Sequence, residues 1–163
     1  MLEIAIWLSE TKWSIALHES LYMYPWIESA HVLSICFFIG ILLFVDLRLM
    51  GVAFTKLPIS EMNKKVLPWS LFGFGLMALT GFLLFYAIPV RSYQNIFFRF
   101  KVILILFAGL NAFLFHRQMK LEGMNWDEGK SIPKSVHLKA AASLVLWSGV
   151  IISGRMIAYN WFD

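Results

Sequence analysis

The sequence predicts an all-α integral membrane protein, a four-helix bundle with a short N-terminal helix in the interface. Sixty per cent of the 163 residues are hydrophobic and only 15% are charged, whereas about a quarter of the residues of soluble domains are charged. Four segments are apolar and long enough to cross a bilayer. The chain has the length of a single domain, residues 1–163.

The four predicted spans cover residues 26–44, 66–89, 96–115 and 138–159. Each has roughly 20 residues, the length that crosses ~30 Å of hydrocarbon as a helix. Basic residues occur in the first turns of the third span, where long side chains can reach the interface. The N-terminus lacks the basic region of a cleavable signal peptide, so we expect the first span to act as the insertion signal.

Residues 2–22 precede the first span and are predicted to form one or two short helices in the outer interface. Trp13, Leu17 and Leu21 recur every four residues, with polar and charged residues between them. This spacing is typical of a helix lying on a membrane surface. Trp7 and Trp13 are expected to be aromatic anchors at headgroup level.

Three connections join the predicted spans. The first, residues 45–66, is expected to lead into a helix that starts close to Pro68, because proline is tolerated in a first turn. The second, around 90–95, is short, so spans two and three are predicted to form a tight antiparallel hairpin. The third, about 117–136, is polar and contains two glycines and a proline, which predicts a loop.

The basic residues predict the orientation. The positive-inside rule places the two connections that are rich in Lys and Arg in the cytoplasm, and both termini on the other side. In a bacterial inner membrane that side is the periplasm. The net charge of +4 is therefore attributed to topology and lipid contact, and not to nucleic-acid binding. Counted over residues 45–66 and 116–139, the two loops hold nine of the fourteen basic residues: Arg48, Lys56, Lys64, Lys65, Arg117, Lys120, Lys130, Lys134 and Lys139.

Polar side chains in the spans are the candidates for function, since such groups are costly in a bilayer. They fall into an outer group and a cytoplasmic group. The outer group is Glu28, His31, Thr80, Lys101 and Arg155, and the cytoplasmic group is Asp46, Arg48, His116 and His137.

Helical spacing predicts which faces point into the bundle. Glu28 and Asp46 lie five turns apart on one face of the first span, and His31 is close enough to that face to point inward. One face of the fourth span joins both polar groups and is predicted to point inward as well. It carries His137, Leu144, Ser148, Ile151 and Arg155.

Histidines at matching depth on neighbouring helices are typical of haem b sites, in which each imidazole supplies one axial nitrogen. His116 and His137 meet this condition at the cytoplasmic end. At the outer end, His31 would pair with His18 if the N-terminal helix folds back. His31, His116 and His137 are therefore the predicted metal ligands.

Basic side chains at the rim of such a site would neutralise the haem propionates. Arg155 and Lys101 are predicted to do so at the outer end. No C-x-x-C-H motif occurs, so haem would not be held covalently. The chain also lacks hydrolase and nucleotide-binding motifs.

The same polar residues also fit an ion-paired scaffold. In that alternative, Glu28 pairs with Lys101 or Arg155. Asp46 pairs with Arg117 or His116.

Five runs of residues resemble a family of small bacterial inner-membrane proteins known mainly as a domain of unknown function. The resemblance covers nearly the whole chain and implies a four-helix bundle without assigning an activity. A more distant similarity, to di-haem b-type cytochromes and copper-resistance membrane proteins, motivates the haem hypothesis by analogy. The runs are residues 19–31, 45–51, 67–69, 109–116 and 154–159.

The runs include His31 and His116 but neither His18 nor His137. A haem held by His31, with Met156 or a partner subunit as the second ligand, is thus an alternative to the bis-histidine pairs.

The functional hypothesis from the sequence is a membrane b-type cytochrome-like electron-transfer subunit linked to the quinone pool. Its expected partners are the lipid bilayer, quinone and a larger membrane redox complex or a second copy of the chain. Two alternatives stay open. One is a non-catalytic accessory or scaffold subunit, and the other is a small ion carrier that uses Glu28, Lys101 and Arg155.

Overall fold

The computed structural model describes residues 2–127 and 132–159, excepting the side chains of 122–125 and 127. All regular structure in this part of the chain is helical. The helices are α1 (Leu2–Ser9), α2 (Lys12–Glu19), α3 (Met23–Leu49), α4 (Ile59–Ala87), α5 (Pro89–Gln94), α6 (Ile96–Asp127) and α7 (Lys134–Met156).

Four of these helices, α3, α4, α6 and α7, are long and apolar enough to cross a membrane. The apolar part of α6 ends at Leu121. Most residues in the four spans are not fully buried within the protein, as expected where lipid replaces water around apolar residues. The chain is therefore a multi-pass membrane protein in a lipid bilayer, and the predicted fold class is confirmed.

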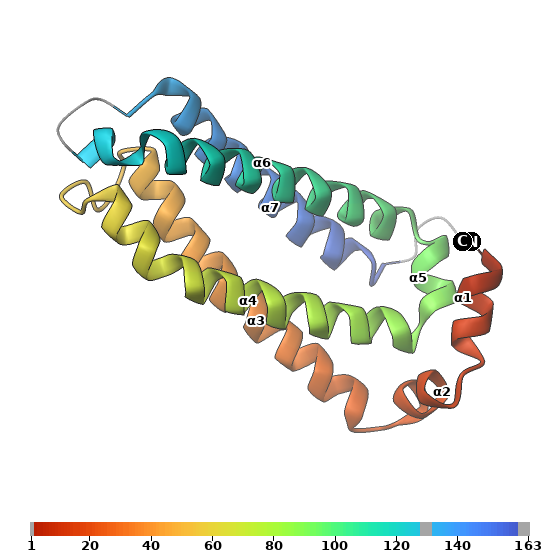
Figure 1. Ribbon diagram of the computed structural model, residues 1–163. Coiled ribbons are helices and arrows are strands. Elements are labelled where there is room, and N and C mark those ends of the chain that lie inside the picture. Colours follow the sequence, from red (N-terminus) through yellow and green to blue (C-terminus); the bar gives the residue numbers. More distant parts are fainter. Residues whose placement is uncertain (1, 128–131, 160–163) are drawn as a thin grey trace.

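The bundle consists of two antiparallel helix pairs, α3 with α4 and α6 with α7 (Figure 1). The short helices α1, α2 and α5 gather at one end, which we call the terminal end because the described chain begins and finishes there. The opposite end, which carries the connection 50–58, the last turn of α6 and the first turn of α7, is called the loop end.

The predicted hairpin of spans two and three is wrong. Helix α4 contacts α3 far more closely than it contacts α6. The backbone leaves the helical region at Ile88, and Pro89 then starts α5 at its first turn, where a missing N–H costs little. Helix α5 therefore separates the ends of α4 and α6 and packs against α1.

The two loop-end connections are shorter than predicted, because α3, α4 and α6 all extend beyond the bilayer-length segments. Helix α4 begins at Ile59, so Pro68 lies inside the helix and not near its start. Ile59 and Met62 are buried, and this packing stabilises the additional turns. Helix α6 likewise continues to Asp127 through a segment that was predicted to be a loop; Gly129, expected in that loop, lies outside the described residues.

Hydrogen bonds fix the N-terminal helices to the bundle. Thr11 is the N-cap of α2 and accepts from the Ser14 amide at 3.4 Å. Its hydroxyl also lies 2.7 Å from the Tyr86 hydroxyl, and Ser14 donates to the Tyr86 carbonyl at 2.8 Å. Helix α2 is therefore held against the end of α4, with Trp13 exposed as a surface anchor requires.

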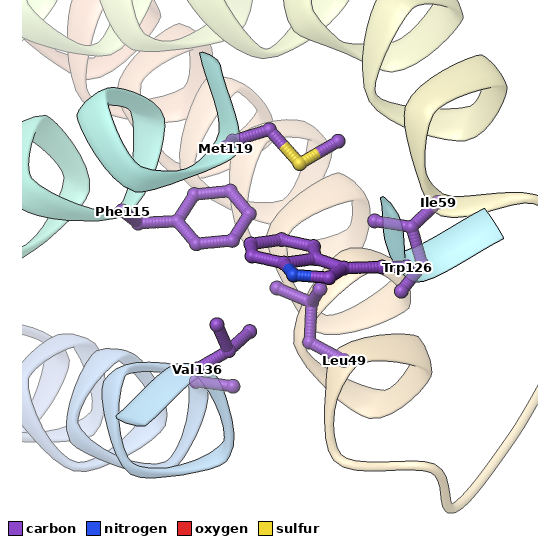
Figure 2. Close-up of a cluster of buried hydrophobic side chains, with 7 residues drawn as sticks. Leu49, Ile59, Phe115, Met119, Trp126 and Val136 are labelled. Atoms are coloured by element: carbon purple, nitrogen blue, oxygen red, sulfur yellow. The ribbon is translucent and has the colours of Figure 1, made fainter. Parts of the chain in front are cut away.

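Two clusters of buried apolar side chains make the core. The loop-end cluster is centred on Trp126, whose indole lies among Phe115, Met119, Ile59 and Leu49 (Figure 2). The central cluster lies nearer the middle of the bundle and consists of Phe38, Met77, Ala108, Trp147 and Val150.

The predicted inward face of α7 is wrong. The buried residues of this helix are Val136, Ala140, Ser143, Trp147, Val150 and Ser153, whereas Ser148, Ile151 and Arg155 are exposed. The large apolar residues Trp147 and Val150 join the central cluster, and this packing sets the rotation of the helix.

Candidate functional site

His31 lies in α3 about two turns from its start and is buried. Its Nδ1 is 2.8 Å from the Thr80 hydroxyl of α4. Thr80 can donate its own proton to the Leu76 carbonyl at 2.8 Å, and we therefore assign the Nδ1–H tautomer to His31, with the Thr80 hydroxyl as acceptor. In this tautomer Nε2 carries the lone pair of the neutral ring.

Glycines allow close approach around this histidine. A β-carbon at Gly81 would lie 3.1 Å from His31 Cε1, so the ring packs directly against the α4 backbone. Lys101 lies near the start of α6, at the same end of the bundle. Its ammonium group would lie 3.3 Å from a β-carbon added at Gly154. The terminal end thus holds both a buried imidazole and a half-buried lysine.

The other predicted residues of the outer group are arranged differently. His18 is exposed and lines a cleft of about 440 Å³ with Ser14, Glu19 and Arg91, and His31 does not line this cleft. The Arg155 guanidinium donates to the Tyr159 hydroxyl at 3.3 Å and lies over the same ring. The predicted pairing of His31 with His18 has no supporting contact in the described part of the chain.

At the loop end, His116 and His137 each use Nδ1 for a carbonyl four residues earlier. His116 Nδ1 is 2.9 Å from the Ala112 oxygen, and His137 Nδ1 is 3.2 Å from the Pro133 oxygen. Both Nδ1 atoms are thus protonated in the neutral rings, and Nε2 is left to accept. His116 lines an internal cavity, whereas His137 does not line it, so their pairing stays a prediction.

This loop-end cavity has a volume of about 60 Å³ and is lined by all four long helices. It is too small for a haem, since one water molecule occupies about 30 Å³. Its polar lining is Asp46 from α3, Asn63 and Ser70 from α4, Asn111 and His116 from α6, and Lys139 and Ser143 from α7.

The sequence analysis placed Asp46 near His116 but missed the cavity and its amide side chains. Asn111 lies within a predicted span. A polar amide in a span, like a histidine, is costly and therefore indicates a candidate site. Its Nδ2 donates to the Lys139 carbonyl at 2.9 Å. The neighbouring Lys139 ammonium donates to Gln118 Oε1 at 2.5 Å, and these bonds join α6 to α7.

The predicted ion pairs are not formed among the described residues. Their one ion pair joins Lys65 and Glu61 at 2.6 Å, on the surface of α4. Glu28 is exposed, although it was predicted to share an inward face with Asp46. The buried residues of α3 are instead His31, Ser34, Phe38, Asp46, Arg48 and Leu49.

Residues 2–127 and 132–159 contain no group of three or more His, Cys, Asp or Glu side chains that could hold a metal ion. A metal at His31 would therefore need its other ligands from a cofactor, from a methionine or from another chain.

Fold and sites together define a small polytopic membrane protein with polar sites at the two ends of its bundle. The chain belongs to a family of unknown function, DUF6644, whose model matches residues 19–160. This confirms the resemblance to an uncharacterised family. No curated protein and no solved structure matches the chain, so the similarity to b-type cytochromes and copper-resistance proteins stays a prediction.

Proposed function

We propose that this protein is an electron-transfer subunit of the bacterial inner membrane that binds haem b through His31. The observation that carries the proposal is the hydrogen bond from His31 Nδ1 to Thr80, since it leaves Nε2 free for a metal. Histidines that ligate metals generally donate their other ring N–H to a fixed acceptor, which sets the tautomer and the orientation of the ring.

Two residues at the terminal end would serve a bound haem. Gly81 lets the imidazole lie against the α4 backbone, and Lys101, near the start of α6, would supply a positive charge for a propionate. The haem iron supplies a one-electron couple between its ferric and ferrous states. The residues of this chain would hold the His31 imidazole, keep its proton on Nδ1 and shield the site from water.

The second axial ligand comes from outside the histidines of this bundle. His116 and His137 lie at the loop end, at about the depth of Asp46 on α3. Along α3, the helical rise from His31 to Asp46 is roughly 22 Å. A partner subunit or a second copy of the chain would complete the coordination, and quinone would exchange electrons with the haem. The positive-inside rule puts the His31 site on the periplasmic side.

The test is haem retention in histidine variants of the full chain purified from haem-replete cells. His31→Ala should lose its haem, because Ala cannot ligate iron, while His18→Ala should keep the wild-type haem content. The measurement is haem per chain after extraction, with folding checked by circular dichroism. Full haem retention by a folded His31→Ala variant would remove this assignment.

A further inference from the structure

The loop-end cavity contains two buried acceptors without a donor. Asp46 is 4% exposed, and its Oδ2 has no hydrogen-bond partner within the described residues. The same holds for His116 Nε2. Because His116 donates through Nδ1 to Ala112, Nε2 carries a lone pair. Both side chains line the cavity, and buried acceptors left unpaired are costly.

The cavity lies between the two apolar clusters of the bundle. It shares Leu49, Phe115 and Ala140 with the loop-end cluster. Another residue of the cavity lining, Leu42, packs against the central cluster. The two acceptors are therefore flanked by hydrophobic layers along the bundle axis. The Ser143 side chain is hydrogen-bonded to the Asp46 carboxyl group, but Oδ2 and His116 Nε2 still lack a donor within the described residues.

The charge of the lining indicates what this donor is. Lys139 from α7 faces the same cavity as Asp46 and His116 and does not pair with Asp46 among the described residues. Its ammonium donates to Gln118 and to the Leu114 carbonyl. The α4 side of the lining has no ionisable group. A zinc ion would meet a positive charge and only two of the three or four nitrogen, sulfur or carboxylate ligands that it requires.

We propose that Asp46 and His116 form a buried proton-binding site, in which water joins the Asp46 carboxyl group to His116 Nε2. The volume of about 60 Å³ accommodates about two water molecules. A proton taken up from the aqueous phase at the loop end converts the Asp46 carboxylate to a carboxylic acid, and no electron is transferred. The neutral acid then donates through water to the imidazole, so one proton satisfies both acceptors. The site is independent of haem binding at His31.

The proposal is tested by infrared difference spectroscopy of the full chain in lipid between acidic and alkaline pH. We expect one carboxylic acid C=O band that shifts in D2O and disappears in Asp46→Asn. The control is Glu61→Gln, which removes an exposed carboxylate paired with Lys65 and should leave the band unchanged. His116→Phe should move the band to higher frequency, since the acid loses its acceptor.

A second measurement needs no variant. The chain has three aspartates, Asp46, Asp127 and Asp163, so 13C-labelled aspartate shifts the carbonyl bands of only these groups. A labelled acid band that persists at pH values above those at which an aqueous aspartic acid loses its proton identifies the buried site. A carboxylate signature at every pH, or an acid band that neither labelling nor Asp46→Asn affects, would overturn the proposal.

Discussion

At the residue scale, the Thr80 hydroxyl decides which nitrogen of His31 is available. With its own proton directed to the Leu76 carbonyl, Thr80 accepts from the imidazole. The sequence pointed to His31 because a histidine one turn inside the predicted span is costly unless its nitrogens are satisfied. It could not identify Thr80 as the partner, since the contact depends on how α3 and α4 rotate against each other.

Removing this acceptor should destabilise the protein. Thr80→Val leaves His31 Nδ1–H buried without a partner, which costs about 1–3 kcal/mol, whereas Thr80→Ser keeps the hydroxyl. We expect the free energy of unfolding in mixed detergent micelles to fall in Thr80→Val and to stay close to wild type in Thr80→Ser. Equal losses in both variants would mean that the methyl group, and not the hydrogen bond, contributes the stability.

At the element scale, the apolar helices were predictable and their ends were not. The bilayer sets the length of the apolar segments, but the extra turns of α4 and α6 are stabilised by packing at the loop end. Residues 117–127 look like a loop because they are polar. The segment also contains apolar residues, and the indole of Trp126 is buried beside Phe115 and Ile59 (Figure 2). Helix pairing was also missed, because the short α4–α6 connection forms a helix.

Trp126 should therefore be a large contributor to stability. It lies beyond the apolar part of α6, which ends at Leu121, so the hydrophobic effect acts on it as in a soluble core. Trp126→Ala should lower the free energy of unfolding by about 3–5 kcal/mol. Trp13→Ala, at an exposed tryptophan, should change it by less than about 0.5 kcal/mol. Similar losses in denaturant titrations of both variants would contradict the packing of Trp126.

At the scale of the whole molecule, the charge distribution predicts the orientation. The loop end carries Arg48, Lys56, Lys64 and Lys65 in and around the connection 50–58, and the positive-inside rule places it in the cytoplasm. Alkaline phosphatase fused after residue 163 should then be active in the periplasm. The same enzyme inserted in the connection 50–58 should be inactive. The reverse pattern would place the His31 site on the cytoplasmic side.

The whole molecule also limits what one chain can do alone. Its four histidines are spread over α2, α3, α6 and α7, and neither cavity of the described chain is lined by two of them. With His31 as the ligand, a cytochrome built on this bundle would take its second axial ligand from another chain or from a methionine. Haem content measured against oligomeric state would show whether two copies share one haem.

The most direct measurement is the visible spectrum of the protein purified in detergent from haem-replete cells, first oxidised and then reduced with dithionite. We expect a sharp reduced α-band and a shifted Soret band in the wild type, and neither in His31→Ala. A colourless wild-type protein that is folded and retains its lipid would contradict the haem assignment and leave a non-catalytic accessory subunit as the function.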